Sequence, residues 1–278
     1  MTSPSTDWPT AAAWLARGSD DPDALVVAGV PLVEHAVTAG SRYDLAPAAI
    51  RQRLAKLSTW QSQRRVDLDH VEVRDLGDDG RPPPLAAPLT VLVGGHNGVT
   101  FHALAGAELD RIGLLTLDAH HDVRPYSPGA VGNGSPVRAL IDAGLPGSNV
   151  VQVGIHGFSN SRAHHEWCLA AGITVLGPGR LEDVPDLLDI LAGRCDAIYV
   201  DIDLDVLDRA FAPGCPGSRP GGARPNEVFD AAFAAGAHPS VRAVDIVEVD
   251  PSADVAHVTV DAAALTLLNV AAGYATRR

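Results

Sequence analysis

The chain has 278 residues, 46% of them hydrophobic and 20% charged, and its 34 acidic residues against 21 Lys and Arg give a formal net charge of −13. This composition is typical of an acidic globular protein and excludes a disordered chain. No run of basic residues could neutralise phosphates, and no stretch approaches the roughly 20 apolar residues of a membrane span. Neither a nucleic acid nor a membrane is therefore expected as a partner.

The N-terminus and the cysteines indicate the compartment. The first 20 residues lack the basic start and unbroken apolar stretch of a secretory signal, and we expect residues 1–20 to form a loosely ordered segment. The three cysteines, Cys168, Cys195 and Cys215, are widely spaced and form no CxxC. This pattern argues against disulfides and a zinc-thiolate site and predicts a cytoplasmic protein.

Short apolar runs alternate along the chain with segments of helical spacing. Runs rich in Val, Ile and Leu predict buried strands over residues 24–30, 89–94, 113–118, 150–155, 173–176, 197–203 and 241–248. Helical spacing predicts helices over residues 46–57, 136–143, 162–171, 185–191, 227–235 and 261–274, and segments 82–84 and 213–225 predict loops. The alternation predicts one α/β domain over residues 1–278, with a parallel sheet covered by helices on both faces.

Polar clusters follow four of the predicted strands. They occupy residues 94–97, 118–122, 201–205 and 245–250. In a parallel sheet the carboxyl ends of the strands share one edge, where ligand sites form. We therefore expect all four clusters to meet in one crevice.

The sequence LDAHHDVRP at residues 117–125 carries Asp118, His120 and Asp122 directly after an apolar run. Carboxylate oxygens with one imidazole suit Mn, Fe, Co or Ni better than a structural zinc. The alternative is a solvated turn in which Asp118 caps the next helix. Taken alone, this motif leaves both interpretations open.

Three aspartates, Asp201, Asp203 and Asp205, alternate with Ile and Leu in the sequence YVDIDLDVLDRAFAPG at residues 199–214. Alternation on a strand places the three carboxylates on one face. Like charges so close together raise one another's pKa unless a cation neutralises them. A metal site is favoured over the alternative of a frayed, exposed strand end.

These motifs resemble those of the ureohydrolases, the arginases, agmatinases, guanidino-acid hydrolases and formimidoylglutamases. The family's DAHxD is similar to residues 118–122, its DxDxxDPxFAPG and later PGG to residues 203–222, and its D-I-V-E-V-N/D-P to residues 245–251. The resemblance covers residues 24–275. It implies a three-layer α/β/α fold with a central parallel sheet of about eight strands and two Mn²⁺ ions at its carboxyl edge.

The resemblance also implies a role for each metal ligand. Asp118 and Asp203 would bridge the two Mn²⁺ ions, His120 and Asp205 would serve one ion, and Asp122 would serve the other. A bridging hydroxide would then attack the carbon of a linear amidine.

Two acidic residues would be catalytic. Glu248 matches the family's carboxylate that holds the amidine or guanidinium group through paired, charge-assisted hydrogen bonds. Asp122 is our candidate for passing a proton to the leaving amine.

Three positions depart from the common pattern. GGHNG at residues 94–98 places Asn97 where GGDHS has a metal-binding His. Asn97 would coordinate through its carbonyl, or His96 would turn inward, or that ion would be held weakly; the first and third are favoured. Asp201 replaces a usual Ser, and Asn133 replaces the His of HGxP. Asn97 and the NGxPVR pattern around Asn133 resemble the formimidoylglutamases.

The charge of the pocket favours an anionic substrate. Arg124, Arg138 and Arg219 lie in loops near the crevice, where arginine suits carboxylates, and Asn133 and His156 are further candidate pocket residues. The alternative is an ordinary surface ion pair for each arginine.

We therefore predict that the substrate is N-formimidoyl-L-glutamate, which has two carboxylates and an amidine, and that its hydrolysis gives L-glutamate and formamide, a step of histidine degradation. The alternatives are an agmatinase or other guanidino-compound hydrolase that releases urea, and a non-catalytic metal-binding homologue. The resemblance further implies a homo-oligomer, a trimer or a hexamer.

Overall fold

A parallel sheet crosses the molecule in the computed structural model, which describes residues 8–78 and 80–277. Within those residues the sheet has eight strands in the order β4-β1-β5-β10-β9-β6-β7-β8. The strands are β1 (Leu25–Gly29), β4 (Val73–Asp75), β5 (Thr90–Val93), β6 (Ile112–Leu117), β7 (Val150–Val153), β8 (Thr174–Leu176), β9 (Ala197–Asp203) and β10 (Val241–Val247). A separate antiparallel hairpin pairs β2 (Trp60–Gln61) with β3 (Val66–Asp67).

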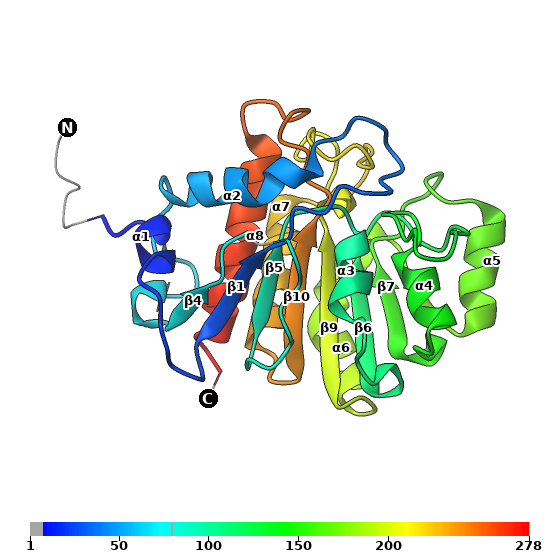
Figure 1. Cartoon of the computed structure of the whole chain (residues 1–278), viewed down its shortest axis with the longest axis horizontal. Helices are drawn as coiled ribbons and strands as arrows, with labels where there is room; N and C mark the ends of the chain where they lie inside the picture. Colours follow the sequence, from blue (N-terminus) through cyan, green and yellow to red (C-terminus); the bar gives the residue numbers. More distant parts are fainter. Residues whose placement is uncertain (1–7, 79, 278) are drawn as a thin grey trace.

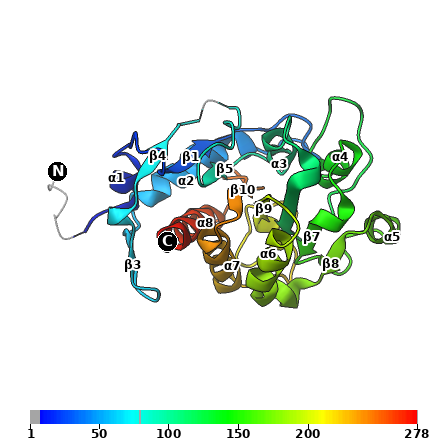
Figure 2. The ribbon, with the colours of Figure 1, turned by 90° about the horizontal axis from the view of Figure 1, so that it is seen from below.

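Helices cover both faces of this sheet (Figure 1, Figure 2). On one face α6, α7 and α8 pack over the central strands, and α3, α4 and α5 cover the other face. The helices are α1 (Ala11–Leu15), α2 (Ala46–Leu54), α3 (Gly98–Ala103), α4 (Pro136–Asp142), α5 (Arg162–Ala171), α6 (Val184–Ala192), α7 (Pro225–Ala237) and α8 (Val258–Tyr274). Short 3₁₀ helices lie in the connections: η1 (Tyr43–Leu45), η2 (Leu68–His70), η3 (Leu109–Arg111), η4 (Gly147–Asn149), η5 (Pro178–Asp183) and η6 (Leu204–Val206).

This architecture confirms the predicted fold class. All seven predicted strands and all six predicted helices are present, because fully buried parallel strands are continuous apolar runs and helices need an apolar stripe. The strand β4 was not predicted, since it is a short edge strand that contains Arg74 and Asp75. The predicted loop 213–225 is confirmed except for Pro225, which begins α7.

The N-terminal segment is more ordered than predicted. Residues 11–15 form α1, in which Trp14 is fully buried and donates its indole N–H to the Val71 carbonyl at 2.9 Å. The stabilisation gained by burying a large aromatic ring orders this segment even though the surrounding residues are polar. Residues 1–7 lie outside the described residues.

The parallel arrangement brings the carboxyl ends of the strands to one edge. There the loop after β1 passes beside the loops that follow β9 and β10, at the top of Figure 1. In the described residues, no helix is long and apolar enough to cross a membrane.

Candidate metal centre and substrate pocket

A group of buried acidic side chains lies where β6 and β9 end side by side. Leu117 pairs with Ile202 in the sheet, so that Asp118 and Asp203 follow neighbouring positions. Two groups have ligand atoms within 4.8 Å of one another: Asp118, His120 and Asp205, and Asp118, Asp122 and Asp203. Asp118 belongs to both groups. The four aspartates and the histidine predicted from two separate motifs are therefore brought together.

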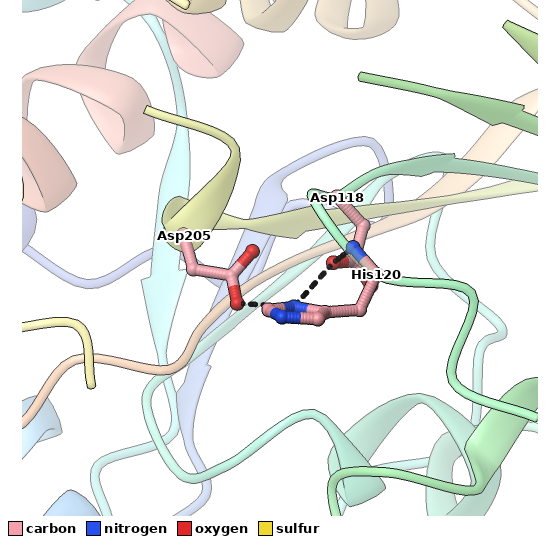
Figure 3. A group of neighbouring side chains, drawn as sticks. All are labelled: Asp118, His120 and Asp205. Carbon is pink, nitrogen blue, oxygen red and sulfur yellow. Dashed lines mark hydrogen bonds and ion pairs between the residues drawn. The ribbon is translucent and has the colours of Figure 1, made fainter. Parts of the chain in front are cut away.

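His120 lies between two carboxylates, as Figure 3 shows. Its Nδ1 atom is 2.8 Å from Asp205 Oδ2 and 3.6 Å from Asp118 Oδ1. Gly217 packs against this group so closely that a Cβ there would stand 2.0 Å from Asp205 Oδ2. Glycine is therefore required at position 217.

The same carboxylates also stabilise the turns in which they occur, by accepting backbone hydrogen bonds. Asp118 Oδ1 accepts the His120 N–H at 2.6 Å, and Asp203 Oδ1 accepts the Asp205 N–H at 2.7 Å. Asp205 Oδ1 accepts the Ala119 N–H at 3.1 Å and so joins the two loops. Asp122 has a φ of 53°, a left-handed conformation that aspartate tolerates better than most residues.

Burial and mutual repulsion dominate the electrostatics of this group. Burial, followed by the charge of Asp205, raises the pKa of Asp118 to about 7, and burial raises the pKa values of Asp122 and Asp203 well above their usual range. Burial opposes protonation of His120, but the charges of Asp205 and Asp118 and the hydrogen bonds to both together outweigh it and raise the pKa of His120 to about 12. One imidazolium cannot neutralise four buried carboxylates.

The donor set fits a divalent cation. Hard carboxylate oxygens with a single imidazole match the ligand preference of Mn²⁺. Buried like charges are otherwise costly, and a cation among them removes that cost. The two overlapping groups share Asp118, and the residues of each could hold a metal ion.

Asn97 reaches the same group from the end of β5. Its Nδ2 donates to Asp201 Oδ2 and to Asp203 Oδ2, both at 3.2 Å, and its Oδ1 lies 3.2 Å from the Thr100 hydroxyl oxygen. In this orientation Asn97 is a donor to the carboxylates, and its carbonyl would face them after a rotation of the amide.

His96 is fully buried and held away from this group. Its Nδ1 accepts the Gly98 N–H at 2.9 Å and its Nε2 lies 2.6 Å from the Glu34 carbonyl. Burial lowers the pKa of His96 to about 4, so the ring is neutral. Both ring nitrogens are engaged outside the group of carboxylates, and the structure does not turn His96 inward.

Asp201 lies behind the metal-binding groups rather than within them. It pairs in register with Asp245 of β10, which accepts hydroxyl hydrogen bonds from Tyr199 at 2.8 Å and Thr100 at 2.7 Å. Burial raises the pKa of Asp201 well above its usual range. Asp201 supports Asn97 and is absent from both groups of candidate ligands.

A pocket of about 210 Å³ opens over these carboxylates. Its wall includes Glu248, whose Oε1 accepts the Asn97 backbone N–H at 2.9 Å and whose Oε2 accepts the Asn133 side-chain N–H at 3.1 Å. Burial raises the pKa of Glu248 to about 7. The pocket is lined by Val37, Thr38, Tyr43, His120, Asp122, Arg124, Asn133, Gly134, Asp203, Asp205, Pro216, Gly217, Arg219 and Glu248.

Two predicted pocket residues lie elsewhere. Arg138 places its guanidinium 4.9 Å from the centre of the Trp167 ring and 3.9 Å from Asp142, because it projects from the outer side of α4. His156 bonds the Gly157 carbonyl at 2.8 Å; it follows β7, which β6 and β9 separate from β10. Neither residue lines the pocket, whereas Arg124 and Arg219 do.

Part of the pocket was not predicted. Val37, Thr38 and Tyr43 come from the loop after β1 and from η1. No motif marks this loop, and the available signal was its position after the carboxyl end of a predicted strand.

Residues 84–273 match the arginase family. Together with the eight-stranded parallel sheet and the group of aspartates at its edge, this match means that the chain belongs to the arginase family. The resemblance to the ureohydrolases is thereby confirmed.

Several individual relatives of this chain are formimidoylglutamases. A formimidoylglutamase of Halalkalibacterium halodurans is 33% identical over 280 residues, which cover 90% of this chain and 87% of that protein. The crystal structure of Bacillus subtilis formimidoylglutamase has a TM-score of 0.88 at 26% identity and covers 100% of this chain and 95% of that chain. Trypanosoma cruzi formiminoglutamase with Mn²⁺ has the same fold, with a TM-score of 0.84 at 23% identity over 98% of this chain and 100% of that chain.

Proposed function

We propose that this protein is a metal-dependent hydrolase that converts N-formimidoyl-L-glutamate and water into L-glutamate and formamide. The observation that carries the proposal is the position of Glu248, a buried carboxylate in the wall of the pocket that holds Asp122, Asp203 and Asp205. A planar amidinium paired with Glu248 would face this group of carboxylates. The formimidoylglutamase relatives support the same substrate.

We propose two Mn²⁺ ions per subunit. Asp118, His120 and Asp205 would hold one ion, Asp118, Asp122 and Asp203 would hold the other, and Asn97 would be a weak ligand of the second ion. When bound, such cations lower the pKa of water enough to supply hydroxide near neutral pH.

The remaining chemistry belongs to the chain's own residues. Glu248, ionised and fixed by Asn97 and Asn133, would orient the amidinium so that its carbon faces the aspartates. When the carbon–nitrogen bond breaks, the departing amine needs a proton. Asp122 lines the pocket and would hold and deliver that proton.

Arg124 and Arg219 would bind the carboxylates of the substrate. Both line the pocket, and arginine forms paired hydrogen bonds with carboxylates. Agmatine is a dication without a carboxylate, so the same arginines would repel it.

Product analysis tests this function. We expect the purified protein with Mn²⁺ to release formamide from N-formimidoyl-L-glutamate, and Glu248→Gln to lose most of that activity because a neutral amide binds a cation weakly. Arg162→Ala, a change on the exposed surface of α5, serves as the control. Urea release from agmatine or arginine would instead identify a guanidino-compound hydrolase, and no product from any of these compounds would identify a non-catalytic homologue.

We further propose that residues 1–278 work as one catalytic domain in the cytoplasm and assemble as a homo-oligomer, a trimer or a hexamer. Strands from Leu25 to Val247 contribute to a single sheet, which supports one domain. The three cysteines are free and buried, which suits a reducing compartment. Light scattering of the purified protein measures the assembly.

A further inference from the structure

Tyr43 is a buried residue of the pocket wall to which neither the metal centre nor the proposed reaction assigns a role. It begins η1 and lines the pocket together with Glu248 and Asp203. Its ring meets the His96 ring edge to face, with centroids 6.1 Å apart and an interplanar angle of 81°. Since His96 is held at both nitrogens, by Gly98 and Glu34, Tyr43 is packed against a fixed neighbour.

The hydroxyl of Tyr43 is buried beside the Glu248 carboxylate and Ser41, but it forms no hydrogen bond of normal geometry with the described residues. Burial, followed by the negative charge of Glu248, raises the pKa of Tyr43, so the hydroxyl stays neutral. A buried hydroxyl without a partner is unfavourable in the free protein. Such a group in a pocket wall indicates a partner that arrives with the ligand.

The hydrogen-bonding capacity of Glu248 shows what that partner is. A carboxylate accepts about four hydrogen bonds. The Asn97 N–H and the Asn133 amide occupy one position on each oxygen of Glu248, which leaves two positions without a hydrogen bond of normal geometry. A substituted formamidinium group carries three N–H bonds, so Glu248 can accept two of them and the third needs another oxygen.

Other oxygens near Glu248 are already committed. Asp122, Asp203 and Asp205 are proposed metal ligands, and the Asn133 carbonyl accepts the Val37 N–H at 2.8 Å. Thr38 is exposed and therefore lies at the mouth of the pocket. The Tyr43 oxygen is the buried acceptor that remains in the described pocket wall.

We propose that Tyr43 is a substrate-binding residue whose hydroxyl oxygen accepts the amidinium N–H that Glu248 leaves unpaired. This inference rests on the proposed function for its substrate, an amidinium cation. It requires only that such a cation pairs with Glu248, so binding can be tested separately from turnover.

The variant Tyr43→Phe removes only the hydroxyl, and Tyr126→Phe is the matched control. Tyr126 is outside the pocket, where its hydroxyl donates to Asp142 at 3.3 Å. Calorimetry with formamidinium chloride on the Mn²⁺-loaded protein measures binding, and steady-state kinetics with N-formimidoyl-L-glutamate measures KM and kcat. We expect Tyr43→Phe to raise both Kd and KM about tenfold, with kcat changed less than about threefold, and Tyr126→Phe to leave all three unchanged.

Thermal unfolding distinguishes binding from a structural role. Because the hydroxyl forms no hydrogen bond of normal geometry in the free protein, Tyr43→Phe should be at least as stable as the wild type without ligand. A lower Tm would show a structural bond and overturn the inference, as would an unchanged Kd for formamidinium or a wild-type protein that does not bind it.

The two proposals fail in different ways. If the wild type hydrolyses N-formimidoyl-L-glutamate and Tyr43→Phe binds formamidinium normally, the role of Tyr43 is wrong and the function stands. If the wild type does not hydrolyse that substrate but Tyr43→Phe weakens formamidinium binding, the function is wrong and the cation site stands.

Discussion

Asn133 connects Glu248 to the loop that follows β1. Its side-chain amide donates to Glu248 Oε2 at 3.1 Å, while its carbonyl oxygen accepts the Val37 N–H at 2.8 Å. Asn133 therefore holds a carboxylate on one side and a wall of the pocket on the other. Asn133 performs this function at the position where the HGxP motif has a histidine.

Replacing Asn133 by Ala should weaken substrate binding more than it slows turnover. The variant removes one donor from a buried carboxylate, and each such loss costs about 1–3 kcal/mol. We expect KM for N-formimidoyl-L-glutamate to rise about tenfold or more, measured by formamide release. Asn226→Ala, an exposed change at the start of α7, is the control. A KM equal to that of the wild type would remove Asn133 from the binding of substrate.

Replacement of the two pocket arginines should raise KM, whereas replacement of Arg138 should not. Arg124→Ala and Arg219→Ala each remove a guanidinium that lines the pocket, and each should raise KM about tenfold because a charged hydrogen bond to the substrate is lost. Arg138→Ala removes a guanidinium that contacts Trp167, and should leave KM unchanged. The reverse order of effects would show that the substrate carboxylates lie over α4.

Gly217→Ala should disturb the metal centre without changing any ligand. A Cβ at this position would stand 2.0 Å from Asp205 Oδ2 and 3.1 Å from His120 Cε1. Asp205 is buried and bonded to Ala119 and His120, so it cannot move aside easily. We expect weaker Mn²⁺ binding by calorimetry and loss of most activity.

The control for this glycine is Gly177→Ala. A Cβ at Gly177 meets nothing within 4 Å, and its φ of −78° suits alanine. Equal Mn²⁺ affinity in the two variants would contradict the tight packing of Gly217 on Asp205.

The effect of Mn²⁺ on stability should increase with pH. Burial raises the pKa of Asp118 from its ordinary 3.8 to about 7 in the folded protein. A carboxyl whose pKa is raised on folding stabilises the protein below its unfolded pKa, and that stability is lost as the pH rises through the folded value. The metal-free protein should therefore lose stability between about pH 4 and pH 7.

Thermal unfolding with Mn²⁺ and with a chelator checks this dependence. Bound cations replace the missing protons, so the Tm increase caused by Mn²⁺ should be larger at about pH 8 than at about pH 5. A Tm increase that is the same at both pH values would show that the carboxylates are not the groups that bind the metal.

Asp122→Asn should separate metal binding from proton transfer. Asparagine tolerates the left-handed backbone that Asp122 adopts, with its φ of 53°, so the loop should keep its shape. We expect kcat to fall at least about a hundredfold, because a general acid or base typically contributes that much. Metal analysis of the purified variant must accompany the rates. Full activity with metal retained would refute the role of Asp122.

Several expectations could be read directly from the residues. Continuous apolar runs predicted seven strands of the sheet, because a strand buried on both faces cannot alternate with polar residues. The acidic positions at the ends of β6 and β9 were predicted together, since parallel strands end at one edge.

The positions of Arg138 and His156 depended on the direction of a side chain and on the order of strands in the sheet. Arg138 was predicted to lie in a loop near the crevice, but it belongs to α4 and its side chain packs against Trp167. His156 also follows a strand, yet β7 lies too far along the sheet from β10 to reach Glu248. The sequence order of strands does not state their order in the sheet, so the distance between two strand ends was not predictable.

The amino-acid sequence by itself determined the alternating α/β architecture, the edge at which the site forms and the acidic chemistry of that site, because these follow from periodicity and residue type. Only the tertiary structure decided that Asn133 holds Glu248, that His96 is held away from the carboxylates and that Tyr43 lines the pocket. These are contacts between residues tens to hundreds of positions apart, and they depend on packing that local pattern does not encode.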